Sequence, residues 1–324
     1  GSQTADAAPP AEATAAELLA RVRHGKKIPV IFDTDIGNDI DDTWALVMLL
    51  KSPELDVRLV VADHDNTIYR AKILAKMLQV MGRTDIPVAV GPQKGDRPGR
   101  QSAWIGDYTL EQYPGKVYQD GVGALIETIM ESPDPITLIC VGPVPNIRVA
   151  LAREPGIARK ARFVGMHGSV YRGYGNSPKP SPEWNVRADP KALQAVFAAP
   201  WEITITPLDT CGIVHLAGNR YQKVRRCNDP GVQALMRNYE AWAKSQDPSG
   251  KRIKPDRRSS TLFDTVAVYL AYSEELVTME EVPLRVTDKG FTVIDQKGRP
   301  VRCATKWKSL DGFKDHLVRR LTGG

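Results

Sequence analysis

Hydrophobic positions recur with two different periods along the chain from Ile28 onward. Short runs rich in β-branched residues are typical of buried strands, and segments with an apolar residue every three or four positions are typical of amphipathic helices. The expected strands are Val30–Asp33, Val57–Ala62, Pro87–Val90, Ile136–Val141, Arg162–Met166 and Glu202–Thr206. The expected helices are Thr43–Lys51, Tyr69–Met81, Ala124–Met130, Asn146–Arg153, Pro190–Ala198, Val232–Ser245 and Thr265–Tyr272. This alternation predicts an α/β fold with a mainly parallel, Rossmann-like central sheet flanked by helices.

The C-terminal part departs from this alternation. Leu284–Thr287 and Phe291–Asp295, joined through Asp288-Lys289-Gly290, predict a small β-hairpin, and a closing helix is expected at Gly312–Leu321. No internal repeat and no shift in composition marks a linker. Residues 28–324 are therefore expected to form a single domain.

Residues 1–27 are expected to be a flexible N-terminal lead-in, because Gln3–Thr14 is rich in Ala, Pro and Thr. Such a stretch can follow a removed export signal or begin a trimmed cytosolic chain, so the compartment stays open, with export slightly favoured. Two other segments are irregular, Pro92–Gly123 and Arg172–Asn185. Long irregular segments in an α/β domain are often functional, and such loops gather beyond the carboxyl ends of parallel strands.

Composition and charge exclude several classes of protein. The 324 residues are 42% hydrophobic and 25% charged, which is ordinary for a globular protein. The net charge of +6 is dispersed, and its short basic clusters lack the interleaved aromatics of a nucleic-acid platform. No apolar run reaches the roughly 18 residues that span a bilayer. We therefore expect neither a nucleic-acid nor a membrane partner.

The strongest chemical signal is an acidic segment after the first expected strand. Five aspartates fall within the ten residues from Asp33 to Asp42. Helix N-termini favour anions, which accounts for Asp41 and Asp42. It does not account for Asp33 and Asp35, which we expect to face the same pocket from the strand end. An oxygen-ligated Ca²⁺ or Mg²⁺ explains the whole cluster, whereas a helix cap after a solvated turn explains only part of it.

Two other functions fit these residues. In a metal-dependent phosphohydrolase, Asp33 would be the nucleophile and Asp35 the general acid, although Gly37 stands where such enzymes usually have Thr or Val. A non-catalytic nucleoside- or sugar-binding protein could use the same scaffold.

Several spaced motifs between about residues 28 and 275 resemble the nucleoside hydrolase family, the inosine–uridine-preferring type of nucleoside N-ribohydrolase. The family opens with Asp-x-Asp-Pro-Gly-x-Asp-Asp, which Asp33–Gly37 and Asp41-Asp42 match with two extra residues between them. The later matches follow in the family's order and are Val141-Gly142-Pro143-Val144-Pro145-Asn146, Met166 with Gly168, Glu183-Trp184-Asn185, and Asp264 at a helix start.

The resemblance implies Ca²⁺-dependent hydrolysis of the N-glycosidic bond of ribonucleosides, releasing free base and ribose. By position, Ca²⁺ would be held by Asp35, Asp42, the Val141 carbonyl and Asp264, and Asp35 would be the general base. The residues expected to bind substrate are Asp41, Asp65, Met166, Asn176, Glu183, Trp184, Asn185 and Phe263. The partner would be a small-molecule nucleoside, and we expect a homo-oligomer, a dimer or a tetramer.

The sequence departs from the family pattern at Phe263, where many members have a histidine that protonates the leaving base. His167 is a candidate replacement acid. Another branch of the family has an aromatic residue at this position and activates purines by stacking. Phe263, Trp184 and Trp104 could stack in this way, which favours purine nucleosides as substrates.

Overall fold

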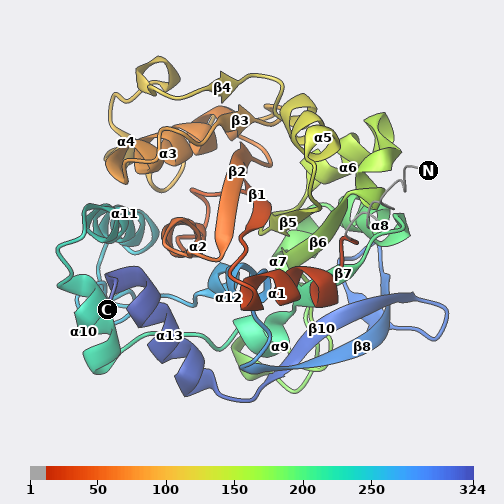
Figure 1. Ribbon diagram of the computed structural model, residues 1–324. Coiled ribbons are helices and arrows are strands. Elements are labelled where there is room, and N and C mark those ends of the chain that lie inside the picture. The colour runs from red at the N-terminus through yellow and green to blue at the C-terminus, as the bar shows by residue number, and fades with distance from the viewer. Residues whose placement is uncertain (1–11) are drawn as a thin grey trace.

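A computed structural model describes residues 12–324 (Figure 1), and its centre is one ten-stranded sheet. The strand order is β4-β3-β2-β1-β5-β6-β7-β10-β8-β9. Neighbouring strands are parallel from β4 through β10, β8 is antiparallel to β10, and β9 is antiparallel to β8. The strands are β1 Ile28–Thr34, β2 Leu55–Ala62, β3 Val88–Val90, β4 Val117–Tyr118, β5 Ile136–Cys140, β6 Ala161–Met166, β7 Ile203–Thr206, β8 Val277–Val286, β9 Thr292–Ile294 and β10 Arg299–Trp307. The predicted α/β class with a mainly parallel sheet is confirmed.

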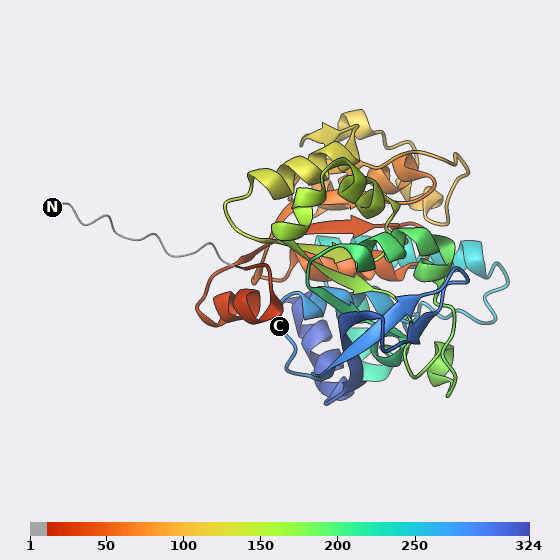
Figure 2. The same cartoon turned by 90° about the vertical axis from the view of Figure 1, so that its right-hand side faces the viewer.

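Helices cover both faces of the sheet (Figure 1), and Figure 2 brings the α5, α6 and α8 side to the front. The α-helices are α1 Ala15–Arg23, α2 Asp41–Leu50, α3 Thr67–Val80, α4 Ser102–Ile105, α5 Gly121–Glu131, α6 Pro145–Arg153, α7 Trp184–Ala188, α8 Pro190–Ala198, α9 Leu208–Cys211, α10 Gly218–Arg225, α11 Pro230–Gln246, α12 Phe263–Leu270 and α13 Leu310–Thr322. Three short 3-10 turns lie at Leu110–Gln112, Pro155–Arg159 and Tyr174–Asn176. No helix within residues 12–324 is long and apolar enough to cross a membrane.

The structure differs from the sequence-based prediction at both ends of the chain. Part of the expected lead-in forms helix α1, whose Leu18 is buried, while residues 1–11 lie outside the described part. The C-terminal hairpin exists, as β8 and β9, but it is attached to the parallel sheet by β10. That strand is easily missed in the sequence because Arg299, Arg302 and Lys306 flank or interrupt its buried run of Val301 and Cys303–Thr305.

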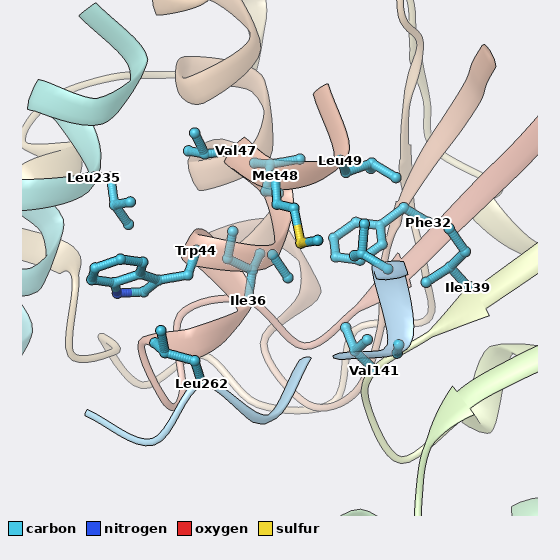
Figure 3. Close-up of a cluster of buried hydrophobic side chains, with 14 of the residues drawn as sticks. Phe32, Ile36, Trp44, Val47, Met48, Leu49, Ile139, Val141, Leu235 and Leu262 are labelled. Atoms are coloured by element: carbon cyan, nitrogen blue, oxygen red, sulfur yellow. The ribbon is translucent and has the colours of Figure 1, made fainter. Parts of the chain in front are cut away.

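A buried apolar cluster lies under the carboxyl end of β1 (Figure 3). It joins Phe32, Ile36, Trp44, Val141 and Leu262, all at most 2% exposed. Three of them, Ile36, Trp44 and Leu262, come from the loop and helix starts that carry the acidic residues, and their close packing leaves those backbones little freedom. The polar side chains next to them in the sequence are thereby held in fixed positions.

Candidate active site

The N-termini of two helices bring three carboxyl groups together. Helices α2 and α12 pack against each other, and Asp41, Asp42 and Asp264 offer carboxylate oxygens that lie within 4.8 Å of one another. One Asp41 oxygen accepts the backbone N–H of Asp264 at 3.0 Å, and the Thr34 hydroxyl donates to Asp42 at 2.6 Å. Because both helix dipoles point their positive ends at this place, it is suited to negative charge.

Burial strongly disfavours the charged form of these acids. It raises the pKa of Asp35, Asp41 and Asp264 well above their ordinary values, and neighbouring carboxylates raise them further. The same two causes raise the pKa of Asp42 to about 7. Asp35 contacts the carboxyl of Asp42, so it belongs to the same cluster. Without a compensating cation, these groups keep protons at pH values where exposed aspartates have lost them.

The loop between β1 and α2, which carries Asp35, is held by three side chains from other elements. Arg70 donates through Nη1 to the carbonyls of Asp35 and Ile36 at 2.8 and 3.1 Å. The Tyr69 hydroxyl donates to the carbonyl of Gly37 at 2.9 Å, and Trp242 Nε1 donates to that of Asn38 at 3.1 Å. This loop is therefore fixed from α3 and α11, far away in the sequence.

Gly37 is required where it stands in this loop. Its φ is +104°, and a Cβ added there would lie 2.5 Å from Cε1 of Tyr69. We expect Gly37→Ala to lower the free energy of unfolding by about 2–4 kcal/mol through backbone strain and the clash together. Urea unfolding measures this, with Gly25→Ala as the control, because Gly25 also has a positive φ but nothing within 4 Å of the added Cβ. Equal losses in the two variants would contradict the clash.

The opposite wall of the site comes from the ends of β5 and β6 and from α7. Asn185 Nδ2 donates to the carbonyl of Val141 at 3.1 Å and to that of Met166 at 2.9 Å. Glu183 accepts the backbone N–H groups of Gly168 and Asn185 at 3.0 and 2.6 Å. Burial raises the pKa of Glu183 to about 7. Because both amide hydrogens of Asn185 are used, its amide oxygen is the group left to accept a hydrogen bond from a ligand.

Four aromatic side chains, Trp184, Phe263, Tyr174 and Trp242, line the same space. Tyr174 meets Phe263 edge to face with ring centroids 6.3 Å apart, and its hydroxyl accepts the backbone N–H of Trp184 at 2.9 Å. These rings provide flat apolar surfaces beside a strongly acidic cluster. Such a division suits a ligand with one polar end rich in hydroxyls and one flat aromatic end.

Together these residues enclose a cavity of about 470 Å³. Most of the predicted site residues line it: Asp35, Asp41, Asp42, Val141, Met166, Glu183, Trp184, Asn185, Phe263 and Asp264. Sequence reasoning missed the other lining residues, which are Asn38, Asp39, Arg100, Tyr174, Leu208, Trp242, Gln246, Ser260 and Thr261. Among these residues only Asn38 and Asp39 could have been noticed in the sequence, because they lie in the two-residue insertion of the opening motif.

Two predicted substrate-binding residues do not line the cavity. Asn176 faces a separate surface hollow, because the 3-10 turn Tyr174–Asn176 directs Tyr174 into the cavity instead. Asp65 is exposed after β2, with φ +58°, and its carbonyl accepts the backbone N–H of Lys94 at 2.9 Å. The structure therefore places neither residue at the cavity with the other predicted site residues.

Asp33 also faces away from the cavity, contrary to expectation. Its carboxylate accepts a hydrogen bond from Asn146 Nδ2 at 3.0 Å. Asp63 lies beside it and accepts the backbone N–H groups of Val144 and Asn146 at 3.0 and 3.2 Å. Asp33 and Asp63 thus brace the turn after β5, where Val144 has a φ of +61°.

Neither His167 nor Trp104 reaches the cavity. His167 is fully buried, its Nε2 lies 2.7 Å from the carbonyl of Gly142, and burial lowers its pKa to about 4. Because His167 is buried and does not line the cavity, it is not placed to donate a proton to a leaving base there. The ammonium group of Lys76 lies 4.2 Å from the ring centroid of Trp104. Trp242, and not Trp104, lines the cavity.

The donor atoms at the acidic end are all oxygens. Carboxylates of Asp35, Asp42 and Asp264 and the carbonyl of Val141 suit a hard cation such as Ca²⁺ or Mg²⁺. No Cys or His side chain is among the described residues that line the cavity, so the soft or imidazole donors favoured by zinc are missing. The residues predicted as ligands therefore fit a hard divalent cation, and Asp41 lies close enough to join them.

Comparison with known proteins assigns the family. The family profile described as inosine-uridine preferring nucleoside hydrolase matches residues 30–314. A non-specific ribonucleoside hydrolase of Klebsiella pneumoniae subsp. pneumoniae is 29% identical over 88% of this chain and 94% of its own. A pyrimidine-specific ribonucleoside hydrolase of Citrobacter koseri is 31% identical over 63% of this chain and 67% of its own.

Solved structures show the same fold. A plant nucleoside hydrolase superposes with a TM-score of 0.76 and 22% identity, over 92% of this chain and 99% of that one. A purine-preferring ribonucleoside hydrolase from Gardnerella vaginalis gives 0.73 and 20%, over 91% and 98%. With the family profile covering most of the chain, the protein belongs to the inosine-uridine preferring nucleoside hydrolase family and is a hydrolase acting on N-glycosyl bonds.

Proposed function

We propose that the protein hydrolyses ribonucleosides to free base and ribose in a Ca²⁺-dependent reaction, with purine nucleosides favoured. The observation that carries the proposal is the division of the cavity into an acidic end and an aromatic end. Asp35, Asp41, Asp42 and Asp264 gather at one end, and Trp184 and Phe263 lie among the aromatic lining. A nucleoside has the matching halves, a ribose rich in hydroxyls and a flat base.

At the acidic end, Asp35, Asp42, Asp264 and the Val141 carbonyl would hold Ca²⁺. When bound, the cation would acidify the attacking water and ligate the ribose 2′- and 3′-hydroxyls. Asp35 would take the proton of that water as general base. Because the ribose becomes oxocarbenium-like as the base departs, the surrounding carboxylates would stabilise its positive charge.

The ribose would be gripped by Asp41, Glu183 and Asn185. Asp41 is fixed by the N–H of Asp264, and Glu183 by those of Gly168 and Asn185. A carboxylate oxygen that accepts one backbone hydrogen bond still has a lone pair for a sugar hydroxyl. Fixed acceptors of this kind orient the sugar before reaction, which lowers the entropic part of the barrier. Met166 would contact the sugar from the end of β6.

The aromatic lining supports the preference for purines. Since base–aromatic stacking is worth about 1–3 kcal/mol per base, the larger purine surface gains more from Trp184 and Phe263 than a pyrimidine does. We therefore expect Trp184→Leu to lower kcat/KM for inosine by about tenfold or more and to affect uridine less. Ribose release from a panel of purine and pyrimidine nucleosides measures this.

Trp104→Leu is the matched control, because Trp104 does not line the cavity, and it should leave the purine-to-pyrimidine ratio unchanged. Equal losses on inosine and uridine in Trp184→Leu would contradict the purine preference. Phosphate release from nucleotides without ribose release from nucleosides would contradict the proposed hydrolysis and favour the phosphohydrolase. Nucleoside binding without any turnover would favour the non-catalytic binding protein.

A further inference from the structure

One positively charged side chain lines this acidic cavity. Of the described residues that line the cavity, Arg100 alone carries a positive charge. It follows Gly99 in the long segment between β3 and α4. The opening motif, the ribose-binding residues and the aromatic lining leave its role unexplained.

The backbone on both sides of Arg100 is fixed to the protein interior. A Cβ at Gly99 would lie 2.1 Å from Cε1 of Tyr69, so the chain passes directly against that ring. The backbone N–H of Gln101 donates to the Tyr69 hydroxyl at 2.9 Å. The fully buried Gln101 side chain donates to Thr43 Oγ1 at 3.0 Å and to Asn238 Oδ1 at 2.8 Å. Arg100 is therefore presented from an anchored position.

The guanidinium group lies beside Trp242 in the aromatic lining. Arg100 Nη1 is 3.5 Å from the carbonyl of Asn38, the same carbonyl that accepts Trp242 Nε1 at 3.1 Å. That long contact uses one of the five N–H donors of the guanidinium, and the others remain available to a ligand. Burial raises the pKa of the carboxyl of Asp39, another lining residue, and the positive charge of Arg100 acts on it in the opposite direction, by a smaller amount.

We propose that Arg100 is a catalytic residue that assists departure of the base by donating N–H groups to it. As the C1′–N bond breaks, the base nitrogen keeps the electron pair and the oxygen of water bonds to C1′. The proton of that water passes to Asp35 and then to solvent, and the departed base takes a proton from solvent. A guanidinium beside the base stabilises its negative charge without giving up a proton, at a site that has Phe263 in place of an acid.

This inference rests on the proposed function, and the test compares two leaving groups. Inosine releases a poor leaving group, whereas 4-nitrophenyl β-D-ribofuranoside releases a phenolate that is stable without help. We expect Arg100→Ala to lower kcat on inosine by about 100-fold and kcat on the nitrophenyl riboside by less than about threefold. Arg100→Lys keeps the positive charge but loses the planar guanidinium. We expect its kcat on inosine to lie between that of the unmodified protein and that of Arg100→Ala.

Arg97→Ala is the matched control, since it removes the same charge from an exposed position in the same loop outside the cavity. It should behave as the unmodified protein on both substrates. Equal losses on the two substrates in Arg100→Ala, or no loss on inosine, would overturn the role of Arg100. If the unmodified protein releases ribose from neither substrate, the proposed function itself fails.

Discussion

Replacing Asp42 with asparagine is expected to lower ribose release by at least about 10³-fold and to weaken Ca²⁺ binding strongly. Asp42 lies at the centre of the carboxylate cluster, in contact with Asp35 and Asp264 and held by the Thr34 hydroxyl at 2.6 Å. Asparagine keeps the shape but removes one negative charge, so the remaining ligands bind a divalent cation more weakly. Kinetics of ribose release and calorimetric titration with CaCl₂ measure the two losses separately.

Asp56→Asn is the control for this variant. Asp56 pairs with Arg58 on the outside of β2, at 2.6 Å. Its replacement by asparagine removes the same negative charge as Asp42→Asn but at a position away from the cavity. It should leave both Ca²⁺ binding and ribose release unchanged. If Asp42→Asn retained both properties, the assignment of Asp42 as a metal ligand would be wrong.

Removing the cation with EDTA is expected to reduce ribose release to background and to lower Tm, more at pH 8 than at pH 5. In the cation-free fold the pKa of Asp42 is raised to about 7, and those of Asp35, Asp41 and Asp264 lie well above the ordinary value near 3.8. The folded state therefore holds protons that the unfolded chain has lost above about pH 4. Stability of the cation-free protein falls as pH rises from about 4 through 7.

Under the proposed Ca²⁺ dependence, bound Ca²⁺ is expected to offset this loss because it would pair with the ionised carboxylates. At a hundredfold excess over Kd the gain is about 2.7 kcal/mol, which corresponds to a rise in Tm of roughly 5 °C. Differential scanning calorimetry with CaCl₂ or EDTA at the two pH values measures the shift, and Asp42→Asn should lose it. Full activity in EDTA, or an equal shift at both pH values, would contradict the proposal.

The parts of the site that follow strands could be predicted from the sequence. Asp35 follows a buried strand and Asp42 lies at a helix start, so the local pattern indicates both, whereas Val141 is indicated only by the family motif. The same pattern also indicates Asp33, which does not line the cavity, because it lies within β1 and its carboxylate bonds to Asn146 instead. Arg100 and Trp242 could not be found in this way, because tertiary contacts alone bring their segments to the cavity. The place of Asn176 also could not be found in this way, because the 3-10 turn Tyr174–Asn176 puts Tyr174 at the cavity and Asn176 at a separate hollow. The expected homo-oligomer stays a prediction, which light scattering can test.

The bond between Asp41 and the backbone of Asp264 joins residues 223 positions apart. Closing a loop of that length has a large entropic cost, which the packing of α12 on α2 must offset before the cluster exists. Cation affinity therefore depends on the fraction of molecules in which this packing is complete. Substitutions in the apolar cluster around Trp44 and Leu262 should weaken Ca²⁺ binding although they touch no ligand. Titration with Ca²⁺ would thus report how completely the two halves of the chain have come together during folding.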